Sequence, residues 1–166
     1  MKGIMNLTTL ILICLSGSVK ASEHVDSAEI FEQMKSWVGT WTREGANNSN
    51  FSVEFELTAN DTVLIETWLS NGNKHSLTLY HLNGDHLMAT HYCPQGNQPR
   101  MHLSKDSTLN ELTFSFLDAT NLTSPKMSHQ HSLGFKVASS AGKLIRKESY
   151  LSQSGEEHSE LILLRQ

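Results

Sequence analysis

The chain has 166 residues, with 13 Lys and Arg against 17 Asp and Glu, which gives a formal net charge of −4. This length suits one domain, and a composition of 38% hydrophobic and 18% charged residues is typical of a globular protein rather than a disordered one. The small acidic excess disfavours nucleic-acid binding, which needs a basic surface, and two Cys are too few for a disulfide scaffold.

The first segment has the order of a secretory signal peptide. Lys2 supplies the positive start, residues 7–15 are an almost unbroken apolar run, and the small and polar residues that follow end at Val19-Lys20-Ala21. The apolar run is too short to cross roughly 30 Å of hydrocarbon as a helix, so we expect no transmembrane anchor. Cleavage after Ala21 would leave a signal peptide of residues 1–21 and one domain of residues 22–166. We therefore expect an exported protein, either periplasmic in a bacterium or secreted.

A single helix is predicted next, over residues 25–36. Asp26 is suited to cap its first turn, and Glu29 follows at the position that a capping box requires. Ile30 and Met34 lie on the same helical face, which must therefore cover something apolar.

Beyond the helix the hydrophobic pattern has a period of two, which is typical of half-buried strands. The alternation is clear in 51–57, and Asn83-Gly84-Asp85 predicts a tight hairpin turn. Ten short strands separated by turn residues predict an all-β fold, namely an antiparallel meander barrel with one short N-terminal helix. Short connections, an aromatic content of 7% and the capped helix favour an apolar interior over an outer-membrane barrel. The predicted strands are 38–42, 51–57, 62–70, 75–82, 86–92, 100–104, 112–117, 127–137, 144–151 and 161–165.

Two resemblances agree with this fold. The segment Trp37-Val38-Gly39-Thr40-Trp41 resembles the Gly-x-Trp start of calycin-type barrels, the group of lipocalins, fatty-acid-binding proteins and nitrobindin-like proteins. That resemblance implies that Trp41 closes one barrel end. The motifs Thr90-His91-Tyr92-Cys93, Gly96-Asn97-Gln98-Pro99-Arg100-Met101 and Asp118-Ala119-Thr120-Asn121-Leu122 resemble a bacterial family of small barrel proteins without an assigned activity. This second resemblance implies the fold and a bacterial host.

The nitrobindin-like resemblance raises the alternative of a haem cofactor. Those proteins bind haem through a His near the last strand, and His158 has a similar place here. Arg43 stands where that family has a Gly, and acidic residues surround His158, so an exposed position for this His is the competing interpretation. We expect no cofactor, with haem held by His158 as the alternative.

Nine His are many for a chain of this length, and several fall in phase with apolar residues. His129 and His131 do so in one predicted strand, His91 and Cys93 in another, and His81 in a third. If the apolar face points inward, these side chains line the barrel interior, where a polar group must be hydrogen-bonded or bind something. Metal binding by inward His is an alternative. We expect no metal site, because hairpin pairing places His81 roughly 14–17 Å from His91.

Arg100 opens a predicted strand and has two interpretations. Pointing inward, it would be the counter-charge for a carboxylate or phosphate; pointing outward, it would pair with a surface acid. The first interpretation predicts an amphipathic ligand, anionic or lipid-like. The predicted ligand-binding residues are His81, His91, Cys93, Arg100, His129, His131 and Trp41.

No enzyme motif is present, and we assign no catalytic residue. Cys93 and His91 could form a nucleophile pair, but their spacing on one strand is not in itself a catalytic geometry. The sequence thus favours an exported small-molecule-binding barrel. A haem or metal protein is the first alternative, and an enzyme that uses Cys93 and His91 is the second.

Overall fold

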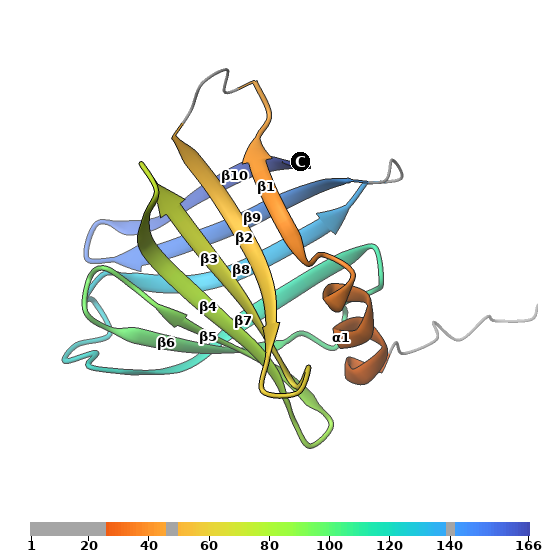
Figure 1. Cartoon of the computed structure of the whole chain (residues 1–166). Helices are drawn as coiled ribbons and strands as arrows, with labels where there is room; N and C mark the ends of the chain where they lie inside the picture. Colours follow the sequence, from red (N-terminus) through yellow and green to blue (C-terminus); the bar gives the residue numbers. More distant parts are fainter. Residues whose placement is uncertain (1–25, 46–49, 139–141) are drawn as a thin grey trace, which may run out of the picture.

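The structure, a computed structural model, describes residues 26–45, 50–138 and 142–166. It has one helix and a closed barrel of ten antiparallel strands (Figure 1). The predicted signal peptide lies outside the described residues. The elements are α1 (Ser27–Lys35), β1 (Gly39–Arg43), β2 (Phe51–Thr58), β3 (Val63–Ser70), β4 (Asn73–Asn83), β5 (His86–Tyr92), β6 (Gln98–Leu103), β7 (Glu111–Thr120), β8 (His129–Val137), β9 (Lys143–Ser152) and β10 (Gly155–Arg165).

The strands form a meander, in which each strand pairs with the next one along the chain. The barrel closes where β1 pairs with β10, with Trp41 opposite Arg165. The hairpin predicted at Asn83-Gly84-Asp85 joins β4 and β5, and Gly84 has the positive φ of 58° that such turns require. The prediction of an all-β meander barrel with one short N-terminal helix is confirmed.

Helix α1 lies at the end of the barrel where β1 begins, packed against β4 and β5 (Figure 1). The Asp26 side chain accepts a hydrogen bond from the backbone N–H of Ala28 at 3.2 Å, so Asp26 is the N-cap as predicted. Ile30, Phe31 and Met34 are the buried residues of the helix, and they join the barrel core.

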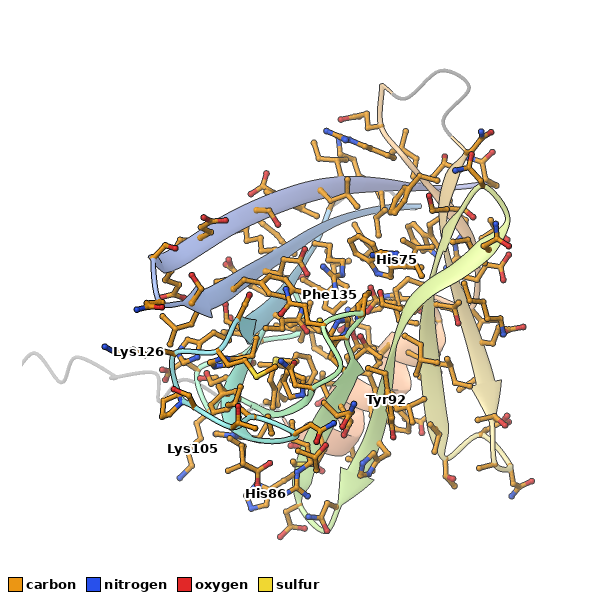
Figure 2. The ribbon with its side chains drawn as sticks, turned by 90° about the vertical axis from the view of Figure 1, so that its left-hand side faces the viewer. His75, His86, Tyr92, Lys105, Lys126 and Phe135 are labelled. Carbon is orange, nitrogen blue, oxygen red and sulfur yellow. The ribbon has the colours of Figure 1, made fainter. Side chains whose placement is uncertain are left out.

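The interior of the barrel is divided between an apolar and a polar part. Next to α1 it is filled by packed apolar side chains, and the Trp37 ring lies 4.9 Å from that of Phe135. Figure 2 shows Phe135 among these side chains, whereas His86, Lys105 and Lys126 lie at the periphery. Towards the opposite end, the interior is filled by polar and charged side chains. The buried members of this polar set are Glu66, Thr78, His91, Gln130 and Arg146.

Candidate functional site: a polar chamber with buried charges

Three charged side chains meet inside the barrel, from β3 and β9. Arg146 Nε donates to Glu66 Oε1 at 2.7 Å, and Arg146 Nη1 donates to Glu148 Oε2 at 2.7 Å. The side chains of Arg146 and Glu66 are 1% and 0% exposed, and that of Glu148 is 16% exposed. Two carboxylates and one guanidinium leave this triad of Glu66, Arg146 and Glu148 with one net negative charge.

Neutral donors complete the triad on the Glu66 side. Trp68 Nε1 donates to Glu66 Oε1 at 2.6 Å, and the Tyr80 hydroxyl donates to Glu66 Oε2. The Trp68 ring also stacks on the guanidinium of Arg146, whose Cζ lies 4.4 Å from the ring centroid. Glu66 is therefore enclosed by donors from three strands, which satisfy the hydrogen bonds of this buried carboxylate.

On the Glu148 side the donors are Gln130 and Ser159. Gln130 Nε2 donates to Glu148 Oε2 at 2.9 Å, and the Ser159 hydroxyl donates to Glu148 Oε1 at 3.2 Å. Two buried atoms of this network, Arg146 Nη2 and Gln130 Oε1, have no hydrogen-bond partner among the described residues. Leaving such groups unpaired costs about 1–3 kcal/mol each, so the protein itself does not saturate this polar interior.

The charges of the triad shift its pKa values in opposite directions. Burial alone would lower the pKa of Arg146, but the carboxylates of Glu66 and Glu148 outweigh it and raise that pKa. Burial likewise raises the pKa of Glu148, but the adjacent guanidinium of Arg146 outweighs it, so the pKa lies below its usual value. Desolvation and the Glu66 charge raise the pKa of the Tyr80 hydroxyl. At neutral pH Arg146 and Glu148 are therefore ionised, and Tyr80 is a neutral donor.

A pocket of about 430 Å³ opens at the barrel end opposite α1 and reaches this network. Trp68 and Glu148 line it and belong to the triad network, whereas Arg146 and Gln130 lie behind them. The volume is within the range of about 300–1,000 Å³ that is usual for small-molecule sites. We call this the mouth pocket. Its lining residues come from β1, β2, β3, β9 and β10: Arg43, Phe51, Trp68, Glu148, Ser159, Glu160 and Leu161.

His91 and Cys93 also lie in the interior, at 3% and 9% exposure. His91 Nδ1 is 2.9 Å from the Thr78 hydroxyl, and its Nε2 is 3.5 Å from the hydroxyl of Tyr150. Burial, with the nearby positive charge of Arg146, lowers the pKa of His91 to about 4, so its ring is neutral at pH 7. The two ring nitrogens thus face Thr78 and Tyr150, which is not the direct thiol–imidazole contact of a nucleophile pair.

His129 and His131 were expected to face the interior, and a β-bulge changes this. The register of β8 against β9 shifts between Gln130 and Ser132, so Gln130 pairs with Tyr150 and shares its inward face. His129 pairs with Leu151 and is 1% exposed, and its Nδ1 contacts the Met127 carbonyl at 2.7 Å. The rings of His129 and His131 pack against Phe116 instead, with centroids 4.7 and 5.5 Å away. The strict alternation expected across 127–137 was wrong because one residue is inserted.

His81 lies on the outer face of β4, contrary to expectation. In this strand Thr78 and Tyr80 are fully buried and point inward, because Tyr80 donates to Glu66. Leu77 and Leu79 share the half-exposed outer face with His81. The apolar face of this strand is therefore the outer one.

Arg100 is also outside the barrel, where it pairs with a surface acid, the second of the two interpretations given for it above. Its side chain is 50% exposed and forms a bidentate ion pair with Asp118, with Nε 2.5 Å from Oδ1. Trp41, by contrast, is inside but belongs to the core: it is 2% exposed and its Nε1 donates to the Trp37 carbonyl at 2.8 Å. Neither residue lines the mouth pocket.

The His158 side chain is 73% exposed and lies 4.0 Å from Glu156 on the outer side of β10. Its neighbour Ser159 points inward to Glu148, so His158 faces away from the interior. A haem inside the barrel would therefore have no ligand in His158. Among the described residues, no group of three or more His, Cys, Asp or Glu has a geometry that could hold a metal ion.

Sequence reasoning did not identify the triad, although one signal for it was present. Glu66 stands between Leu64 and Trp68 on one face of an otherwise apolar predicted strand. Arg146 similarly follows Leu144 on one face of 144–151. A carboxylate and a guanidinium on the apolar faces of two strands indicate a buried pair, because a charge buried alone is too costly.

Comparison with family models and with curated proteins finds no match for this chain. Within the described part of the chain, no helix combines the length and apolar character needed to cross a membrane.

Proposed function

We propose that this protein binds a small molecule in the mouth pocket, at the barrel end opposite α1. The observation that carries the proposal is the buried triad of Glu66, Arg146 and Glu148, which contacts the mouth pocket through Glu148. Replacing a buried ion pair by well-packed apolar residues is often neutral or stabilising, so stability alone is a weak reason to bury this triad. Binding supplies a stronger reason, because a few fixed polar groups in an apolar cavity orient a ligand.

The walls of the mouth pocket favour a compact amphipathic ligand. Phe51 and Leu161 contribute apolar surface, whereas Glu148 and Ser159 contribute polar atoms. The interior next to α1 is occupied by packed side chains such as Phe55 and Phe135, so the ligand occupies the mouth rather than the full length of the barrel. The sequence predicted a lipid-like ligand, and we now propose a shorter molecule that fits the mouth pocket.

The wider setting of this function is also part of the proposal. A meander barrel that begins with Gly39-Thr40-Trp41 and has a Trp in its closed end supports kinship with calycin-type barrels. The order of residues 1–21 supports export to the periplasm or beyond the cell. An exported carrier or scavenger of a small molecule fits both.

Native mass spectrometry of the protein purified from its own host tests the binding proposal. We expect a retained ligand in the wild type and in Leu117→Trp, whose site is 51% exposed on the outer surface. We expect none in Leu161→Trp, because the larger ring would occupy the mouth pocket. A wild-type protein that carries no ligand, or a ligand that survives Leu161→Trp unchanged, would contradict the proposal.

A further inference from the structure

The charges around the mouth pocket do not suit an anionic ligand. At the rim, Arg43 and Glu160 have opposite charges that cancel. Deeper in, Arg146 is bonded to two carboxylates, and the triad keeps one net negative charge. The member of the triad that reaches the pocket is Glu148, an acid. A carboxylate or phosphate entering the pocket would therefore meet a fixed negative charge.

Glu148 also has an acceptor position left over. Its Oε2 accepts two hydrogen bonds, from Arg146 and Gln130, whereas its Oε1 accepts one, from Ser159 at 3.2 Å. A carboxylate offers about four acceptor positions, so Oε1 can take another donor. The side chain is 16% exposed and lines the mouth pocket, which puts that position within reach of a ligand.

Beside this acceptor the pocket wall is aromatic and aliphatic. The Phe51 and Trp68 rings meet edge to face, with centroids 5.1 Å apart, and Leu161 lies across from them in the same pocket. Aromatic faces attract cations as well as apolar groups. The Trp68 face that stacks on Arg146 is already used, which leaves Phe51 and Leu161 as the main apolar contacts.

We propose that the mouth pocket selects a primary amine with a short apolar body, whose ammonium group donates to Glu148 and whose body packs on Phe51 and Leu161. This rests on the proposed function and reverses the anionic ligand expected from Arg100. The ammonium supplies both a positive charge opposite the Glu148 carboxylate and a donor for its Oε1. An alcohol supplies only the donor, and a carboxylate supplies neither.

Hexylamine, 1-hexanol and hexanoate test the proposal as ligands of one chain length, titrated by calorimetry at pH 7. We expect hexylamine to bind about ten- to a hundredfold more tightly than hexanoate, the usual worth of one charge-assisted hydrogen bond, with 1-hexanol between them. Glu148→Gln should abolish the preference, whereas Glu111→Gln, which removes an exposed outer carboxylate, should leave it unchanged.

Glu148→Gln also takes a partner from Arg146, so a thermal melt must show that the variant is folded. Ser159→Ala is the second variant, because it keeps the carboxylate and releases Oε1 from its one hydrogen bond. We expect Ser159→Ala to retain or strengthen the preference for hexylamine. Loss of that preference in a folded Ser159→Ala protein would contradict a role for Glu148 Oε1.

The remaining outcomes separate the two proposals. If hexanoate binds as tightly as hexylamine, and Arg43→Gln removes that binding, the rim arginine selects the ligand and the amine proposal is wrong while the binding proposal stands. If 1-hexanol equals hexylamine, charge has no role and the amine proposal is again wrong. If none of the three binds and the protein from its host is also empty, the proposed function itself fails.

Discussion

Arg146 Nε and Glu66 Oε1 lie 2.7 Å apart, although 80 positions separate the two residues in the chain. Their side chains are 1% and 0% exposed. The contact crosses the barrel interior from β9 to β3, two strands that are not neighbours in the sheet. It therefore forms only when the barrel closes.

Removing one partner of this pair should be strongly destabilising. We expect Glu66→Leu to lower the free energy of unfolding by about 3–5 kcal/mol, because it leaves Arg146 with one carboxylate in a buried site. The double variant Glu66→Leu with Arg146→Met should lose less than the sum of the two single variants. Urea denaturation of all four proteins measures this coupling.

The exposed pair of Arg100 and Asp118 is the matched control. Asp118→Asn should change the free energy of unfolding by less than about 1 kcal/mol, since solvent screens the pair. A loss as large as that of Glu66→Leu would show that burial does not explain the difference.

Stability should fall in mild acid because of His91. Its pKa is about 4 in the folded protein and near 6.5 in the unfolded chain, so the unfolded state binds more protons between these values. The free energy of unfolding should therefore drop by about 3 kcal/mol as the pH falls from 6.5 to 4. His91→Gln should flatten this part of the profile in denaturation series at fixed pH. A parallel profile in the variant would assign the acid sensitivity to other groups.

Gly134 is needed for close packing between β7 and β8. A Cβ at this position would lie 3.0 Å from the carbonyl oxygen of Leu112, a backbone atom that cannot easily move. We expect Gly134→Ala to destabilise the protein by about 1–3 kcal/mol, as overpacking commonly does. Lys136→Ala, on the same face two residues further on, is exposed and should change stability by less than about 0.5 kcal/mol. Equal melting temperatures for the two variants would contradict this.

His129 and His131 should support the fold without affecting the ligand. Both rings pack against Phe116, and neither lines the mouth pocket. The double variant with Gln at both positions should melt at a lower temperature while its affinity for hexylamine stays within about twofold of the wild type. A selective loss of affinity with an unchanged melt would place these rings back at the binding site.

If the protein is exported, its mature chain should begin directly after the signal peptide. If residues 1–21 are a signal peptide, the protein recovered from its host should begin at Ser22, which intact-mass measurement and N-terminal sequencing can check. We expect Ala21→Lys to block processing and leave the longer form, whereas Glu23→Gln should be processed normally. Full-length protein in the cytoplasm of wild-type cells would contradict export.

The strands and their order follow from local patterns. The period-two alternation of 51–57 and the turn at Asn83-Gly84-Asp85 each concern neighbours in the chain, so they predict β2 and the β4–β5 hairpin correctly. The helix is likewise predicted by its own cap, Asp26. Ten such strands in succession leave a closed meander as the simplest arrangement that exposes no edge.

Which side chains face the interior was decided by the tertiary structure. Alternation shows that the two faces of a strand differ, but not which face is inside. In β4 the face with Tyr80 is inside, because the Tyr80 hydroxyl donates to Glu66 on the neighbouring strand β3. The bulge before Ser132 breaks the alternation along β8, and nothing in the local pattern reveals it. Arg146 meets Glu66 only across the closed barrel. The sequence alone therefore determined the strands and their order, whereas closure of the barrel decided which charges meet inside it, since those contacts join residues far apart in the chain.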